Sequence, residues 1–103
     1  MIRHIVLIKF KPEMTEAAIA GIFAALPTLS ARLPGVLGFA SGRSESPEQI
    51  ERGYMHGFTI DFADRASLAT YQADAGHKAF GGSLVANAVG GIEGLLVFDL
   101  AVG

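Results

Sequence analysis

Cysteine and tryptophan are both absent from this chain of 103 residues. Without a thiol the protein has no disulfide, no thiolate nucleophile and no thiolate metal site. Charge is also sparse, since 17% of the residues are charged and the formal net charge is −2. The eight Lys and Arg residues are scattered along the chain. This argues against nucleic-acid binding, which requires a clustered basic surface.

The sequence also lacks a long apolar run free of glycine, so no segment is predicted to span a membrane. Met1 leads directly into a strand pattern without the shape of a signal peptide, and we therefore expect a cytoplasmic protein. Apolar residues, in contrast, make up 50% of the chain. The length predicts one domain spanning residues 1–103. So much apolar surface on so small a body predicts that a second subunit covers part of it.

The hydrophobic pattern predicts four strands, over residues 4–10, 36–43, 54–62 and 95–100. Helical spacing follows Thr15, Asp64 and Asp74, each a good N-cap residue. Pro27 predicts a kink or an early end in the first helix, and Gly90-Gly91 predicts the end of the last one. The resulting order, β-α-β-β-α-β, predicts an α+β, ferredoxin-like fold with one antiparallel sheet.

The first predicted strand is apolar on both faces. His4, Val6 and Ile8 share one face, while Ile5 and Leu7 lie on the other. A single layer of helices covers only one face of such a sheet. We therefore predict a homodimer in which two sheets pack face to face and close into a shared α/β barrel.

The third predicted strand places a histidine among aromatic residues, because Tyr54, His56 and Phe58 share one face. His56 in such a strand is a candidate for orienting a substrate carbonyl; a core histidine satisfied by a neighbouring polar group is the equally weighted alternative. His4 lies in the first strand, at the mouth of any cavity, with structural packing as its alternative.

His77 is the strongest catalytic candidate. With Asp74 as N-cap it falls in the first turn of a helix, where the positive end of the helix dipole favours a neutral imidazole. Tyr71 closes the preceding helix and can place its hydroxyl near the same point. A base and an oxyanion partner of this kind would serve enolate chemistry on a carbonyl substrate. The alternative is a surface histidine beside a half-buried tyrosine.

A metal site built from the three histidines is disfavoured. No pair has the i, i+4 spacing of ligands on a helix, and no carboxylate is tied to them by spacing. Asp99 alternates with Phe98 and Leu100 and is expected on the face opposite to theirs, paired across strands with Lys9 or Arg3. Arg43, Arg52 and the glutamates between them are most simply a solvated loop.

The chain resembles the stress-responsive dimeric α/β barrel (Dabb) domain family over nearly its whole length. The matching segments are His4-Ile5-Val6-Leu7-Ile8-Lys9-Phe10-Lys11, Gly53-Tyr54-Met55-His56, Phe62 with Leu68 and Tyr71, His77 with Phe80, and Leu96-Val97-Phe98-Asp99. The resemblance implies a homodimer of ferredoxin-like subunits that uses no organic cofactor. The resemblance also strengthens the interpretation of His77 and Tyr71 as catalytic residues.

A plant polyketide cyclase of this family carries its ring closure on a Tyr and a His that match Tyr71 and His77. Its strand histidines match His4 and His56. Two departures limit the transfer of its substrate: the family's His-Pro-Ala-His is Asp74-Ala75-Gly76-His77 here, and a pocket tyrosine is replaced by Leu26. The predicted catalytic residues are thus His77 and Tyr71. The predicted substrate-binding residues are His56, His4, Tyr54 and Phe80.

Three functions remain open at this point. The first is a cofactor-independent acid/base enzyme, a lyase, cyclase or isomerase acting on a hydrophobic carbonyl or phenolic compound. The second is a non-catalytic stress-response or ligand-binding module, in which the histidines only fill space. The third is a cofactor-free oxygenase, since similar dimeric barrels carry out such chemistry.

Overall fold

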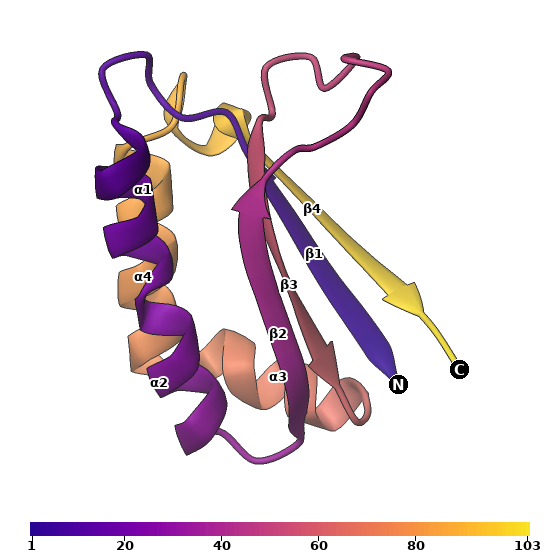
Figure 1. Ribbon diagram of the computed structural model, residues 1–103. Coiled ribbons are helices and arrows are strands. Elements are labelled where there is room, and N and C mark those ends of the chain that lie inside the picture. The colour runs from indigo at the N-terminus through magenta and orange to yellow at the C-terminus, as the bar shows by residue number, and fades with distance from the viewer.

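A computed structural model describes residues 1–103 as one four-stranded antiparallel sheet with helices on one face (Figure 1). The strands are β1 (Ile2–Ile8), β2 (Val36–Arg43), β3 (His56–Phe62) and β4 (Leu95–Ala101). Their spatial order is β2-β3-β1-β4. This arrangement confirms the predicted ferredoxin-like fold.

The helices are α1 (Glu16–Phe23), α2 (Ala25–Arg32), α3 (Arg65–Ala73) and α4 (Ala75–Ala86), with a 3₁₀ turn, η1 (Gly91–Gly94), before β4. All three predicted caps are confirmed. The side chains of Thr15, Asp64 and Asp74 each accept a hydrogen bond from a backbone N–H in the first turn that follows.

The interruption predicted near Pro27 lies at Ala24, between α1 and α2. Pro27 has no N–H to offer to the carbonyl of Phe23 four residues earlier, so the helix cannot continue unbroken. Several boundaries differ from the prediction. β1 spans Ile2–Ile8 instead of residues 4–10, and β4 ends at Ala101 instead of residue 100. β3 begins at His56, two residues after Tyr54, and α4 ends at Ala86, before Gly90.

The face of the sheet beneath the helices forms the core. Val6 and Ile8 of β1 lie there beside Phe58 and Ile60 of β3. Helices α1 to α4 add further buried side chains: Ile19, Phe23, Leu26, Leu29, Tyr71, Phe80 and Leu84. Each such side chain contributes about 1.5–3 kcal/mol through burial, so this layer supplies most of the stability of the chain.

The opposite face of the sheet, which we call the open face, has no helix over it (Figure 1). Ile5 pairs with Phe98 and Leu7 with Leu96 across β1 and β4, and the side chains of these pairs point away from the helices. Phe98 is 60% exposed. The sheet is thus apolar on both faces, as predicted. No helix is both long and apolar enough to cross a membrane.

Candidate functional site

His4 lies on the buried face of β1 and is held by a carboxylate. Its side chain is 5% exposed, and Nδ1 lies 2.5 Å from Oδ1 of Asp99 on the neighbouring strand β4. The two residues are direct cross-strand partners. Asp99 thus lies on the face opposite Phe98 and Leu100, as predicted. The predicted pairing with Lys9 or Arg3 is wrong, because Arg3 binds Asp61 instead, at 2.9 Å.

Tyr71, near the end of α3, packs between two imidazoles. Its ring centroid lies 4.1 Å from that of His77 and 5.7 Å from that of His4. The residue is 1% exposed, and its hydroxyl is buried without a hydrogen-bond partner. Burial raises the pKa of Tyr71, so its hydroxyl keeps its proton at neutral pH.

His77 sits in the first turn of α4, as predicted from Asp74. Its backbone N–H donates to Oδ2 of Asp74 at 3.0 Å, and its ring Nδ1 lies 3.3 Å from the carbonyl oxygen of Gln72. Arg32 binds both carboxylate oxygens of Asp74, at 2.8 and 2.7 Å, which fixes the cap. Burial lowers the pKa of His77 and favours its neutral form.

Asp99, His4, Tyr71 and His77, which we call the inner cluster, come from four different elements: β4, β1, α3 and α4. The carboxylate of Asp99 beside Nδ1 fixes the orientation of the His4 ring. A neutral His77 can accept a proton, and the protonated Tyr71 hydroxyl can donate a hydrogen bond to a developing oxyanion. The cluster therefore holds the parts of an acid/base centre.

His56 does not join the inner cluster. It lies opposite Ile8 in the β1–β3 register, whereas His4 lies opposite Ile60. The two positions are four residues apart along β3, which corresponds to about 13 Å. The structure therefore brings together His4, Tyr71 and His77 but places His56 at the other end of the same face.

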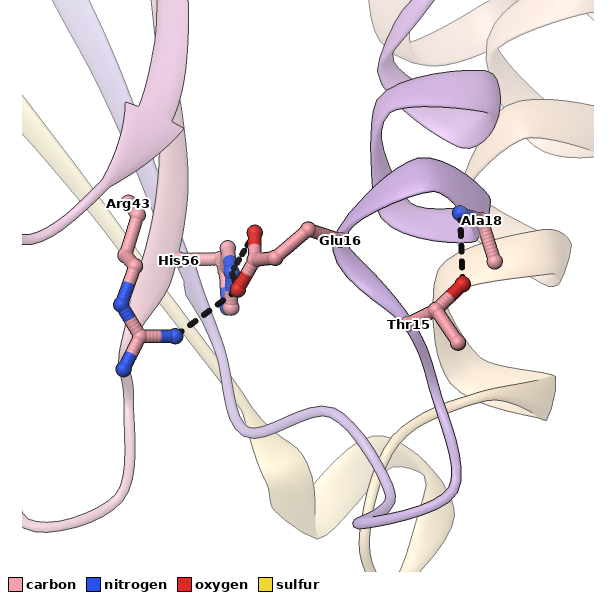
Figure 2. A network of polar contacts seen from close by, with 5 residues as sticks. All are labelled: Thr15, Glu16, Ala18, Arg43 and His56. Atoms are coloured by element: carbon pink, nitrogen blue, oxygen red, sulfur yellow. Dashed lines mark hydrogen bonds and ion pairs between the residues drawn. The ribbon is translucent and has the colours of Figure 1, made fainter.

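The Nε2 of His56 lies 3.0 Å from both carboxylate oxygens of Glu16, the first residue of α1. Arg43, at the end of β2, donates from Nη1 to Oε1 of the same carboxylate at 2.9 Å. Figure 2 shows the Glu16 side chain reaching from α1 to the sheet to meet both partners. These contacts lower the pKa of Glu16 and keep it ionised. We call Glu16, Arg43 and His56 the rim cluster.

Two cavities border the rim of the molecule, and neither is lined by His4, Tyr71 or His77. One, of about 330 Å³, lies between α1 and β2 beside the rim cluster. The other, of about 740 Å³, lies over the open face beneath the β2–β3 loop, and Tyr54 lines it. Tyr54 is thus outside the strand and away from the inner cluster, and its hydroxyl donates to the Glu93 carbonyl at 3.3 Å.

Phe80, the remaining predicted site residue, belongs to the core. It is buried one turn after His77, and its ring lies 5.2 Å from that of Phe58. Phe58 in turn packs beside His4, with ring centroids 6.3 Å apart. Phe80 therefore supports the wall of the inner cluster. As for metals, no three side chains among His, Cys, Asp and Glu converge on a common point.

Asp99, Glu16 and Arg43 were not recognised as site residues from the sequence. The expectation that no carboxylate is tied to the histidines is wrong, because both strand histidines have one. One signal was present for Asp99: it is the only charged residue in an otherwise apolar strand. For Glu16 the sequence indicated only an acidic residue in the first turn of a helix, which stabilises the helix dipole.

Comparison with known proteins places the chain in a family. The family described as Stress responsive A/B Barrel Domain matches residues 2–102. No curated protein sequence matches the chain. Among solved structures, a dimeric ferredoxin-like protein of unknown function from Jannaschia sp. is 35% identical, with a TM-score of 0.91 and 98% of each chain covered.

Two solved structures with stated activities share the fold at lower identity. The hydroxynitrile lyase of Passiflora edulis is 19% identical, with a TM-score of 0.83 and coverage of 99% of this chain and 93% of that one. SnoaB, a cofactor-independent oxygenase from Streptomyces nogalater, is 13% identical, with a TM-score of 0.76 and coverage of 98% and 91%. The match over almost its full length shows that this chain belongs to the stress responsive A/B barrel domain family.

Proposed function

We propose that this protein is a cofactor-independent acid/base enzyme that acts on a small hydrophobic carbonyl or phenolic compound, in a lyase, cyclase or isomerase step. The observation that carries the proposal is the Tyr71 hydroxyl. It is buried without a partner beside two imidazoles. A buried unpaired hydroxyl costs about 1–3 kcal/mol. Such a cost is typical of a group kept for binding or catalysis.

The roles follow from the protonation states of the cluster. The neutral His77 imidazole takes a proton from the carbon next to the substrate carbonyl, and the resulting oxyanion accepts a hydrogen bond from the Tyr71 hydroxyl. His4, held by Asp99 and lying beside Tyr71, positions the substrate oxygen. Proton transfer of this kind needs no external oxidant and no redox group.

A non-catalytic ligand-binding or stress-response module is the second candidate. The dense packing around Tyr71 favours this candidate. The Tyr71 ring lies beside the Phe62 ring, with centroids 5.2 Å apart, as well as beside the two imidazoles. In that case the histidines complete the core and nothing reacts there. The two candidates make opposite predictions for removal of the Tyr71 hydroxyl.

Proton exchange at carbon provides the test. Aryl ketones and β-dicarbonyl compounds are incubated with the protein in D₂O, and loss of the α-proton signal is followed by NMR. We expect catalysed exchange that Tyr71→Phe and His77→Gln each reduce by about 100-fold. Tyr54→Phe is the matched control and leaves the rate unchanged. Absence of exchange across the panel, or equal rates in wild type and Tyr71→Phe, would favour the non-catalytic module.

We further propose that two copies of the chain associate through the open face. Support comes from its exposed apolar residues on β4: Leu96, Phe98 and Leu100. The Jannaschia relative is described as dimeric. A two-fold dimer requires a surface that is complementary to itself, and an apolar sheet face satisfies this requirement without charge matching.

A further inference from the structure

We propose that Arg32 is a positioning residue for His77. Arg32 is the last residue of α2 and acts through Asp74, which ends α3 and caps α4. We call the Arg32–Asp74 pair the clamp. It holds the His77 ring so that Nδ1 carries the proton and Nε2 is left as the base. The role of His77 as a base rests on the proposed function, but the tautomer of its ring can be measured without any substrate.

The clamp is a two-point contact on a protected carboxylate. Nη1 of Arg32 donates to Oδ1 of Asp74 at 2.8 Å, and Nη2 donates to Oδ2 at 2.7 Å. The Asp74 side chain is 14% exposed and that of Arg32 is 49% exposed. The parallel hydrogen bonds of a planar guanidinium fix the direction of both side chains. They also hold the pKa of Asp74 well below its ordinary value, so the carboxylate stays charged.

The backbone and the ring of His77 are both held from this turn. Oδ2 of Asp74 accepts the backbone N–H of His77 at 3.0 Å. The ring Nδ1 lies 3.3 Å from the carbonyl oxygen of Gln72, and because a carbonyl only accepts, this hydrogen bond requires the proton on Nδ1. Nε2 of the neutral ring is then free to accept a proton. Gln72 precedes Asp74 by two residues, so a displaced cap also displaces the carbonyl that orients the ring.

Gly76 leaves the room that the clamp needs. A Cβ at this position would lie 2.6 Å from Nη2 of Arg32 and 2.9 Å from Oδ2 of Asp74. Both distances are too short for van der Waals contact, so any side chain here pushes the pair apart. Glycine is unfavourable inside a helix, and the clamp accounts for its place in the first turn of α4. Gly76→Ala therefore disturbs the clamp without changing the charge of either partner.

Several charged and titratable groups surround the His77 ring. They are Asp74 and Lys78 of α4, Tyr71 of α3 and His4 of β1. Among them Asp74 is the anion, and Arg32 neutralises it. Without Arg32 the uncompensated carboxylate favours the imidazolium, so the pKa of His77 should rise.

The ring nitrogen chemical shifts of His77, measured by NMR on the full-length protein, test the clamp. In the wild type we expect a neutral ring with the proton on Nδ1. Arg32→Met should give a mixture of tautomers and a raised pKa, and Gly76→Ala should give the same change of tautomer. Arg65→Met is the matched control, since it removes the same charge from an exposed position at the start of α3. Unchanged ring shifts in Arg32→Met, or a wild-type proton on Nε2, would overturn the proposal.

Kinetics of proton exchange separate the clamp from the proposed function. Arg32→Met should lower kcat about ten-fold and leave KM unchanged, because Arg32 orients the base without contacting substrate. Arg32→Lys keeps the charge but lacks the planar fork, so it should restore the pKa of His77 and not kcat. A wild-type kcat in Arg32→Met would contradict the clamp. A change of tautomer in a protein that catalyses no exchange would support the clamp and refute the role of His77 as a base.

Discussion

The helix-covered face and the open face of the sheet are built from the same strands and from similar residues. Val6, on the covered face, alternates along β1 with Ile5 and Leu7 of the open face. What differs is the polar content. The covered face carries His4 and His56, each paired with a carboxylate. The polar contact on the open face is the ion pair between Arg3 and Asp61.

This difference separates two uses of apolar surface. The two histidines on the covered face are buried and paired with carboxylates, an arrangement typical of functional sites. The open face has little chemistry and much exposed apolar area, a combination typical of association surfaces. The comparison predicts that equivalent substitutions on the two faces have different consequences.

The largest effect is expected from truncating a phenylalanine on each face. Phe62→Ala removes a fully buried side chain and should lower the free energy of unfolding by about 3–5 kcal/mol. Phe98→Ala removes an exposed one and should cost less than about 1 kcal/mol at low protein concentration, with a larger loss at high concentration as association contributes. Chemical denaturation at several concentrations measures both. Equal losses at low concentration would refute the distinction between the faces.

A charge on the open face should prevent association. Leu96→Glu places a carboxylate on the proposed interface and should raise the dimer dissociation constant at least about 100-fold. The far-UV circular dichroism should not change, because Leu96 is exposed in the single chain. Val97→Glu is the matched control, since Val97 is also exposed but points to the helix side. A dimer that survives Leu96→Glu would show that another surface is used.

On the covered face, removal of the unpaired hydroxyl is expected to stabilise the protein. Tyr71→Phe should raise the free energy of unfolding by about 1 kcal/mol while the proposed catalysis is lost. Tyr54→Phe removes a hydroxyl on the exposed side and should change stability by less than about 0.5 kcal/mol. Denaturation of the two variants in parallel is the measurement. A loss of stability in Tyr71→Phe would mean that its hydroxyl is paired in solution.

The smallest expected effect is a pH dependence from His77. Its pKa is lowered by burial, so the unfolded chain binds the proton more tightly than the folded one. The contribution of this residue to stability is therefore present above its unfolded pKa and is lost as the pH falls through its lower, folded pKa. The free energy of unfolding should decrease as the pH is lowered from 7 to 5, and His77→Gln should reduce that slope. An unchanged slope in this variant would contradict the burial of the imidazole.

Local features of the sequence predicted the fold well. The starts of α1, α3 and α4 are predictable from a cap residue and the few residues after it, and Thr15, Asp64 and Asp74 act as predicted. The approach of Tyr71 to His77 was also predictable, because the cap at Asp74 fixes the short turn between their helices. These predictions depend on neighbours within one or two turns of the chain.

Contacts between distant segments were not predictable in the same way. Asp99 meets His4 across 95 positions of sequence, and its side depends on the parity of β4. Leu95, Leu96, Val97 and Phe98 are all apolar, so alternation gives no indication of which residues face the helices. Glu16 reaches His56 only because of how α1 packs on the sheet, and a first-turn acid carries no information about that packing.

The molecular mass of the unmodified protein in solution tests the central claim most directly, namely that a second copy covers the open face. Light scattering coupled to gel filtration at micromolar concentration should give about twice the 10.8 kDa of one chain, with Leu96→Glu eluting at the mass of one chain. A wild-type protein that stays at 10.8 kDa under these conditions would contradict the account.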